Sequence, residues 1–146
     1  MENNLKIEID SNLLNIAVVR VAVATFVSSL DISIDDLMDI KMAVSEAVTN
    51  SIEHGYENYP GKVVIETNIK SITDDVVTIL IKDEGIGISD IELATTPAYT
   101  SKPELEHAGL GFTIMESFMD QIEIDSSVDK GTTIKLIKII KKKKSI

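Results

Sequence analysis

Two side chains in one helical segment have the types and spacing that phosphate chemistry needs. Glu46 and Asn50 lie four residues apart, so both project from the same side of a helix that we expect over residues 34–54. An Asn carbonyl oxygen suits Mg²⁺, which keeps several waters and takes phosphate oxygens as further ligands. A carboxylate one turn away can orient a hydroxyl and accept its proton. Taken alone, the pair also fits an ordinary solvated helix face.

A third candidate group ends a predicted strand over residues 75–83. Val77, Ile79 and Ile81 face one way, and Asp83 continues that apolar side by the period of two. A buried carboxylate without a partner is costly. We therefore expect Asp83 to meet a donor of the protein or a donor of a ligand, such as an exocyclic amine.

Most glycines fall at junctions between expected elements. Five of the seven lie at three such places, namely Gly55, Gly85, Gly87, Gly109 and Gly111. Gly55 alone indicates a helix C-cap. The run from Asp83 to Ile88 alone indicates a turn after a strand. Gly109-Leu110-Gly111 precedes a helix, where backbone amides cradle phosphate or simply form a tight junction. Gly61 and Gly131 indicate ordinary turns.

The hydrophobic pattern predicts an α+β protein with one domain over residues 1–146. Leu5, Ile7 and Ile9 alternate with polar residues and predict a first strand. Ser33 and Asp36 have the spacing of a capping box. We expect strands near 5–9, 62–70, 75–83, 121–126 and 132–140, helices at 13–30, 34–54 and 110–120, and a long loop at 84–109. Adjacent hairpins predict a mixed, mostly antiparallel sheet covered on one face by helices, which is a two-layer sandwich.

The first predicted helix is apolar on nearly every side. Its polar residues, among them Asn15, Arg20 and Thr25, do not gather on one face. Such a helix either lies in the centre of the core or is partly covered by a second subunit or partner. Arg20 is the only arginine of the chain, and it either contacts a partner protein or is solvated or paired locally.

Composition and charge exclude several classes of function. The formal net charge is −10, and without residues 138–146 the body carries −15, which disfavours nucleic-acid binding. The absence of cysteine excludes disulfides, a thiol nucleophile and zinc knuckles. No P-loop and no protein-kinase motif set is present. We see no leader and no apolar run long enough for a bilayer, and expect a cytoplasmic protein whose lysine tail, Lys141–Lys144, is solvated.

In this order, the motifs resemble the N, G1 and G2 boxes of the GHKL ATPase/kinase superfamily. The matching segments are Glu46-Ala47-Val48-Thr49-Asn50 with His54-Gly55, then Asp83-Glu84-Gly85-Ile86-Gly87, then Gly109-Leu110-Gly111-Phe112. The resemblance covers almost the whole chain and implies the Bergerat ATP-binding fold. Residues 45–56 and 99–106 are similar, more narrowly, to the anti-sigma serine kinases of endospore-forming bacteria.

The resemblance implies a role for each matching residue. It makes Glu46 the general base, Asn50 the Mg²⁺ ligand, and Asp83 the acceptor for the adenine amino group. Residues 95–111 correspond to an ATP lid, and Thr132 or Thr133 to the threonine that supports the adenine-binding carboxylate. The full set expected to bind ATP is Asn50, Asp83, Gly85, Gly87, Ile88, Thr100, Ser101, Lys102, Gly109, Leu110, Gly111, Phe112, Thr132 and Thr133.

The resemblance also implies partners. We expect an ATP- and Mg²⁺-dependent kinase that phosphorylates a serine of an anti-anti-sigma protein and holds an RNA polymerase sigma factor inactive. A homodimer through the first strand and helix is implied as well. The phosphoaccepting domain of sensor kinases is not found, so His54 is expected to be structural. Two alternatives stay open: a module that sequesters its partner without phosphorylating it, and an ATPase module of a larger assembly.

Overall fold

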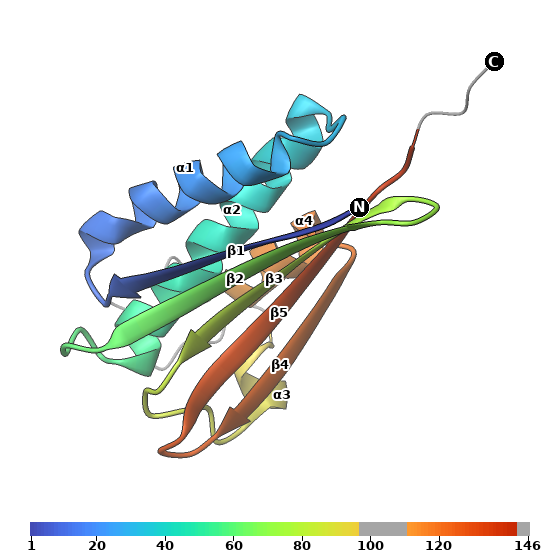
Figure 1. The fold of residues 1–146 in the computed structure, drawn as a ribbon. Coiled ribbons are helices and arrows are strands. Elements are labelled where there is room, and N and C mark those ends of the chain that lie inside the picture. The colour runs from blue at the N-terminus through green and yellow to red at the C-terminus, as the bar shows by residue number, and fades with distance from the viewer. Residues whose placement is uncertain (97–110, 143–146) are drawn as a thin grey trace.

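The five strands form one antiparallel sheet in the order β1-β2-β3-β5-β4 (Figure 1). The computed structural model describes residues 1–96 and 111–142. The strands are β1 (Glu2–Asp10), β2 (Lys62–Ser71), β3 (Asp75–Asp83), β4 (Gln121–Ser127) and β5 (Gly131–Ile140). All pairings between them are antiparallel. The predicted strands and their antiparallel pairing are therefore confirmed, and the described part of the sheet contains no parallel pair.

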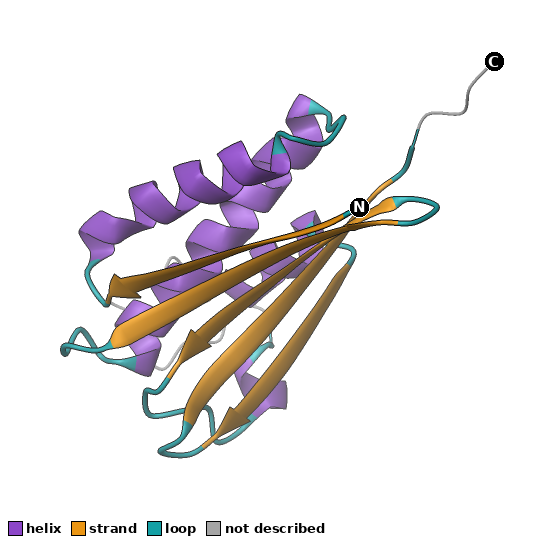
Figure 2. Ribbon diagram, viewed as in Figure 1, coloured by secondary structure: helices purple, strands orange, loops and turns teal. Residues whose placement is uncertain are grey.

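Helices cover one face of this sheet, as the two-layer prediction requires (Figure 2). They are the 3₁₀ turn η1 (Leu13–Asn15), α1 (Ile16–Val27), α2 (Ile34–Asn50), the π-helical turn η2 (Ser51–Gly55), α3 (Ile91–Ala94) and α4 (Gly111–Phe118). Ser33 caps α2 by accepting a hydrogen bond from the Asp36 amide at 3.0 Å, as the spacing predicts. The helix expected over 34–54 changes from α to π geometry at Ser51.

The core lies between α2 and the inner face of the sheet. Fully buried aliphatic side chains come from the helix and from the three central strands, and include Ile40, Val44, Val48, Ile65, Ile79, Ile81, Ile134 and Leu136. Burial of each such side chain contributes about 1.5–3 kcal/mol. Since α2 also carries Glu46 and Asn50, packing of its apolar stripe fixes where those polar groups lie.

Helix α1 is an outer helix with one buried side. Val19, Val23 and Val27 are buried at a spacing of four residues, whereas Val18 and Val21 are 60% and 61% exposed. The interpretation of this segment as a central core helix is therefore wrong. Its apolar pattern arises because hydrophobic residues lie on the solvent side as well as on the packed side. Among residues 1–96 and 111–142, no helix is both long and apolar enough to cross a membrane.

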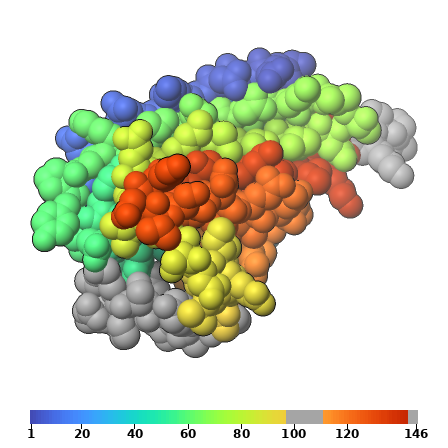
Figure 3. Space-filling view, turned by 90° about the horizontal axis from the view of Figure 1, so that it is seen from below, coloured from blue at the N-terminus to red at the C-terminus, as the bar shows by residue number. Residues whose placement is uncertain are grey.

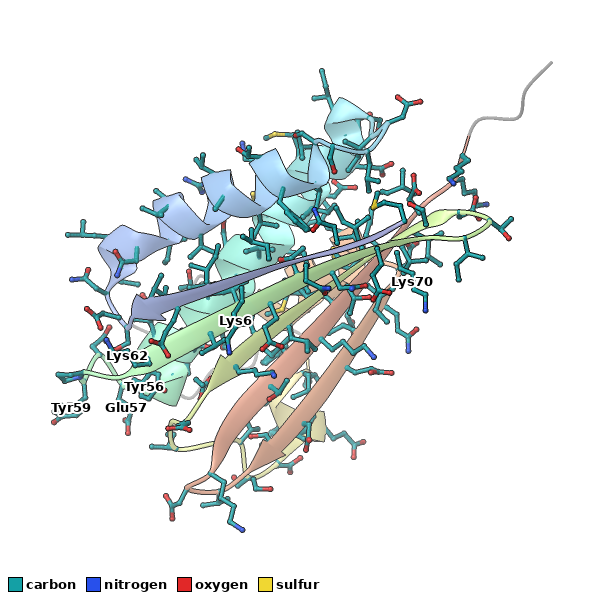
Figure 4. The ribbon with its side chains drawn as sticks, in the orientation of Figure 1. Lys6, Tyr56, Glu57, Tyr59, Lys62 and Lys70 are labelled. Atoms are coloured by element: carbon teal, nitrogen blue, oxygen red, sulfur yellow. The ribbon has the colours of Figure 1, made fainter. Side chains whose placement is uncertain are left out.

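The opposite face of the sheet carries charged and polar side chains. Glu66 on β2 lies 3.9 Å from Lys6 on β1 and 3.0 Å from Lys82 on β3 (Figure 4 labels Lys6). Such exposed pairs contribute little to stability. Side chains on these strands alternate between the two faces, since the neighbours of Glu66 and Lys82 along β2 and β3 point into the core.

One lysine that the sequence analysis counted with the basic tail is in fact buried. Lys138 on β5 is 9% exposed and lies on the inner face of the sheet. Its Nζ donates to Phe118 O at 2.6 Å, at the end of α4, and lies 3.2 Å from Asp39 and 3.7 Å from Asp36 on α2. The charge therefore joins β5, α4 and α2. Removing this cation alone would leave its partners unpaired, which costs stability.

We predict that Lys138→Met lowers the free energy of unfolding by about 2–4 kcal/mol, because it leaves the Phe118 carbonyl and two carboxylates without their cation. Lys135→Met is the matched control, since Lys135 lies on the other face of β5 in a 3.6 Å exposed pair with Glu123. Urea denaturation of both variants measures the difference. Equal, small losses in the two variants would contradict the structural role given to Lys138.

Candidate functional site

Asp83 ends β3 with its side chain on the inner face, as the alternation predicts. It is 7% exposed, and its Oδ1 accepts a hydrogen bond from the Gly85 amide at 2.9 Å. Burial raises the pKa of this carboxyl, while the Gly85 amide, the nearby Ser51 hydroxyl and the Thr132 backbone oppose the rise. A buried carboxyl whose affinity for protons is raised in this way is a functional-site candidate.

Ser51 presents a buried hydroxyl towards this carboxyl. Ser51 is 1% exposed, and within the described ranges its Oγ completes no hydrogen bond of standard geometry. It still lies near enough to Asp83 to lower the pKa of that carboxyl. Buried polar atoms are normally satisfied, so this hydroxyl keeps the capacity to bond a further partner beside the buried carboxyl. Sequence patterns assigned Ser51 no role, although a serine on an apolar stripe directly after Asn50 was a usable signal.

The strand register separates the two candidate threonines. Thr132 pairs with Asp83 across β3 and β5, and it is 6% exposed on the inner face. Thr133 pairs with Lys82, whose side chain reaches Glu66 on the outer face. Only Thr132 therefore lies beside the buried carboxyl.

Glu46 and Asn50 occupy the last turns of α2, as expected. Both side chains are half-buried, and the helix changes to π geometry at the residue after Asn50. Such π turns occur frequently at functional sites. The oxygen of the Asn50 side-chain amide is of the kind that hard cations prefer. No group of three His, Asp or Glu able to hold a metal occurs in residues 1–96 and 111–142.

Gly55 and Gly85 bring two backbone segments into contact around Asp83. A Cβ on Gly55 would lie 3.1 Å from the Asp83 carboxyl, and one on Gly85 would lie 2.1 Å from Gly55 O. Gly55 ends the helical segment, but among the described residues positive φ is confined in glycine to Gly87 and Gly131. The C-cap expected at Gly55 is therefore wrong, since Gly55 is the last residue of η2 and Tyr56 is the cap; the hydrogen side of Gly55 lies close to the carboxyl instead.

Gly131 is more than the ordinary turn that we expected. Its φ is 93°, and a Cβ there would lie 2.0 Å from the Asp83 carbonyl oxygen. The β4–β5 turn thus packs directly on the end of β3. Gly87 also has positive φ, 74°, and contacts Ser127 in the same turn region. Close packing inside the protein explains both glycines, in addition to the access to a nucleotide that the resemblance implies for Gly87.

Ser126 ties the glycine segment to β4 and β5. Its Oγ accepts the Ile88 amide at 2.8 Å and lies 3.0 Å from Gly131 O and 2.8 Å from Thr132 Oγ1. The sequence analysis missed Ser126, because no local pattern reveals a contact across 38 residues. In Figure 3, α3 (yellow) lies next to this β4–β5 region (orange and red).

The remaining candidates lie at α4 or outside the described residues. Gly111 begins α4, and Phe112 is 8% exposed in the core, so its side chain packs within the protein. Thr100, Ser101, Lys102, Gly109 and Leu110, with most of the expected lid, lie outside the described residues.

Arg20 is half-buried and paired locally. Its Nη1 lies 3.5 Å from Ser45 Oγ on α2. This contact is long and weak, which leaves the guanidinium able to exchange it for another acceptor, and a contact of Arg20 with a partner protein stays a prediction.

Three comparisons place this geometry among known proteins. The histidine kinase-like ATPase domain model matches residues 9–138. The anti-sigma F factor of Bacillus velezensis (strain DSM 23117 / BGSC 10A6 / LMG 26770 / FZB42) is 50% identical over 100% of this chain and 99% of its own length, and that of Clostridium kluyveri (strain ATCC 8527 / DSM 555 / NBRC 12016 / NCIMB 10680 / K1) is 51% identical over 94% and 95%. The histidine kinase domain from the Erythrobacter litoralis EL346 blue-light activated histidine kinase superposes with a TM-score of 0.55 at 11% identity; this match covers 88% of our chain and 60% of that one.

The family model that matches residues 9–138 makes the chain a member of the histidine kinase-like ATPase class, and the sheet with helices on one face agrees with it. Sequence identity near 50% to the two anti-sigma F factors, over almost their full length, identifies a narrower group within this class. The chain belongs to the histidine kinase-like ATPase family and, within it, to the anti-sigma F factors.

We predict that Gly131→Ala destabilises the fold by about 1–3 kcal/mol, because alanine is strained at positive φ and its Cβ would collide with the Asp83 carbonyl. Lys130→Ala in the same turn is the control, since Lys130 is exposed. Thermal unfolding of both variants checks the difference. Unchanged stability of Gly131→Ala would show that the turn can move away from β3.

Proposed function

We propose that this chain is an anti-sigma factor and a serine protein kinase that uses ATP and Mg²⁺. The observation that carries the proposal is the buried Asp83 carboxyl, with the unsatisfied Ser51 hydroxyl beside it and the polar end of α2 close in sequence. This arrangement suits a purine whose amino group donates to Asp83. It also supports ATP in preference to a ligand without a donor at that edge.

Base recognition follows from the hydrogen bonds already made by Asp83. Oδ1 accepts the Gly85 amide, and the Ser51 hydroxyl and the Thr132 backbone also lie beside the carboxyl, so the base would donate to one of its remaining lone pairs. A ligand that donates to the carboxylate replaces part of its lost hydration, and the close contact of Gly55 with Gly85 keeps the backbone packed around the carboxyl. Thr132 and the Gly85 amide hold the carboxyl from the sheet side.

Phosphoryl transfer would take place at the α2 end. The Glu46 carboxylate accepts the proton of a partner's serine hydroxyl, the serine oxygen bonds to the γ-phosphorus, and the bond to the β–γ bridging oxygen breaks to leave ADP. Asn50 would hold Mg²⁺, which supplies charge neutralisation on the phosphates when bound. The chain's own contribution is to position Glu46 one helical turn from Asn50.

Partner choice is the regulatory part of the proposal. Relatives that share about half of the sequence are called anti-sigma F factors, which supports an RNA polymerase sigma factor as one partner. An anti-anti-sigma protein would be the phosphorylation substrate, and the nucleotide state would select between the two through different affinities. The exposed apolar side of α1, with Val18 and Val21, is a surface suited to a second copy or to a partner. Such partners place the protein in the cytoplasm.

The experiment that tests the function follows labelled γ-phosphate in a mixture of the protein, Mg²⁺, the sigma factor and the anti-anti-sigma protein of the same organism. Label on a serine of the anti-anti-sigma protein supports the kinase. Tight sigma binding without label supports the sequestering module instead, and release of free phosphate alone supports an ATPase module.

We predict that Glu46→Gln abolishes phosphate transfer while ATP affinity changes less than about threefold, because the amide cannot accept the serine proton but fills the same space. Glu116→Gln on α4 is an exposed control of the same chemistry. Calorimetry gives ATP affinity, and phosphoserine formation gives transfer. Retained transfer, or lost ATP binding, in Glu46→Gln would contradict the role of general base.

We predict that Asp83→Asn weakens ATP binding by about 1–3 kcal/mol, because it turns an amide donor towards the amino donor of the base. The nucleotide-free variant should in addition gain stability relative to the wild type as the pH rises. The folded state raises the pKa of Asp83, so it binds more protons than the unfolded state, and stability falls as the pH rises from the ordinary Asp value through the raised one.

Urea melts of both proteins between about pH 4 and pH 7 test this sign, since Asn cannot ionise. The free energy of unfolding of Asp83→Asn, relative to that of the wild type, should rise with pH and then level off. A relative free energy that falls with rising pH would mean that the folded protein stabilises the charged carboxylate.

A further inference from the structure

Tyr56 links the two strand ends that meet at the buried carboxyl. Its hydroxyl donates to the Lys62 carbonyl at the start of β2 and accepts the Glu84 amide at 2.8 Å, one residue after Asp83. Figure 4 shows Tyr56 and Lys62 side by side at this end of the sheet. Since Val63 pairs with Asp83 across β2 and β3, one phenol joins the ends of two neighbouring strands.

The segment after Asp83 is held at both of its ends. The Glu84 amide is bound by the Tyr56 hydroxyl, and the Ile86 amide donates to Gly55 O at 2.8 Å. Between them, the Gly85 amide donates to Asp83 Oδ1. The position of the Gly85 amide, and with it the orientation of the carboxyl, therefore depends on these two anchors.

The ring of Tyr56 is itself fixed in place. A Cβ on Gly61 would lie 2.4 Å from the ring, so the glycine provides the surface on which the ring lies. The Tyr56 amide donates to Ser51 O at 2.9 Å, which joins the residue to the π turn that presents Ser51. Burial, followed by the nearby charges of Asp83 and Glu84, raises the pKa of the phenol, which keeps its proton at neutral pH although the Glu84 and Lys62 backbone contacts lower the pKa.

We propose that Tyr56 is a positioning residue of the nucleotide site, which sets the orientation of the Asp83 carboxyl through the backbone of residues 84–86 without contacting the nucleotide. The inference rests on the proposed adenine role of Asp83. It has a specific consequence: loss of the hydroxyl should weaken binding of the base and leave the chemistry at Glu46 unchanged, because Glu46 lies on α2 and shares none of these hydrogen bonds.

The test compares Tyr56→Phe with Tyr59→Phe. Tyr59 is 73% exposed, and its hydroxyl has no hydrogen bond to the rest of the described chain. We expect Tyr56→Phe to raise the Kd for ATP and for ADP by the same factor, about 5- to 30-fold, since one hydrogen-bond network at the base end is lost. The KM for ATP should rise while kcat stays within about twofold, and the preference for ATP over GTP should fall. Tyr59→Phe should match the wild type.

A second variant keeps the hydroxyl but moves the ring. Gly61→Ala would push the phenol away from Glu84 and should raise the Kd for ATP in the same direction. An unchanged Kd for ATP in folded Tyr56→Phe, or a fall in kcat at constant KM, would overturn the positioning role. Failure of the wild type to bind ATP would overturn the proposed function itself, and this result is distinct because it does not depend on any variant.

Discussion

The structure depends on the burial of one carboxylate at the end of the central strand. Water would hydrate Asp83 better than the protein does, and burial accordingly raises the pKa of its carboxyl. The surrounding residues offset that cost only in part, through the Gly85 and Thr132 backbone contacts and the nearby Ser51 hydroxyl. A group that is stabilised incompletely by its own protein is prepared to gain from a ligand, and this is the physical link between fold and function here.

Accommodating that carboxylate determines the local sequence. Gly55 and Gly85 allow the end of η2 to approach the carboxyl, and Gly131 allows the β4–β5 turn to lie on the Asp83 carbonyl. Tyr56 then closes the arrangement by hydrogen bonding to both strand ends. Around Asp83, the described part of the site is thus formed by backbone segments in close contact.

Local patterns predicted the elements and the direction of Asp83, because alternation and capping depend on neighbours within a few residues. The strands, the Ser33 cap and the inward carboxyl all follow from such signals. Lys138 and Ser126 could not be found in this way, since their partners lie 99 and 38 residues away along the chain. The burial of α1 was wrongly predicted for a related reason: an apolar pattern does not tell which apolar side meets the core and which remains on the surface.

The place of β3 in the middle of the sheet has a consequence for motion. Both of its edges are hydrogen bonded, to β2 and to β5, so the residues around Asp83 can open only if two ladders separate. Amide protons of β3 should therefore exchange with solvent at the rate of global unfolding. Arrival and departure of a bound molecule must then take place with the sheet intact, so the sheet is a rigid floor for the site.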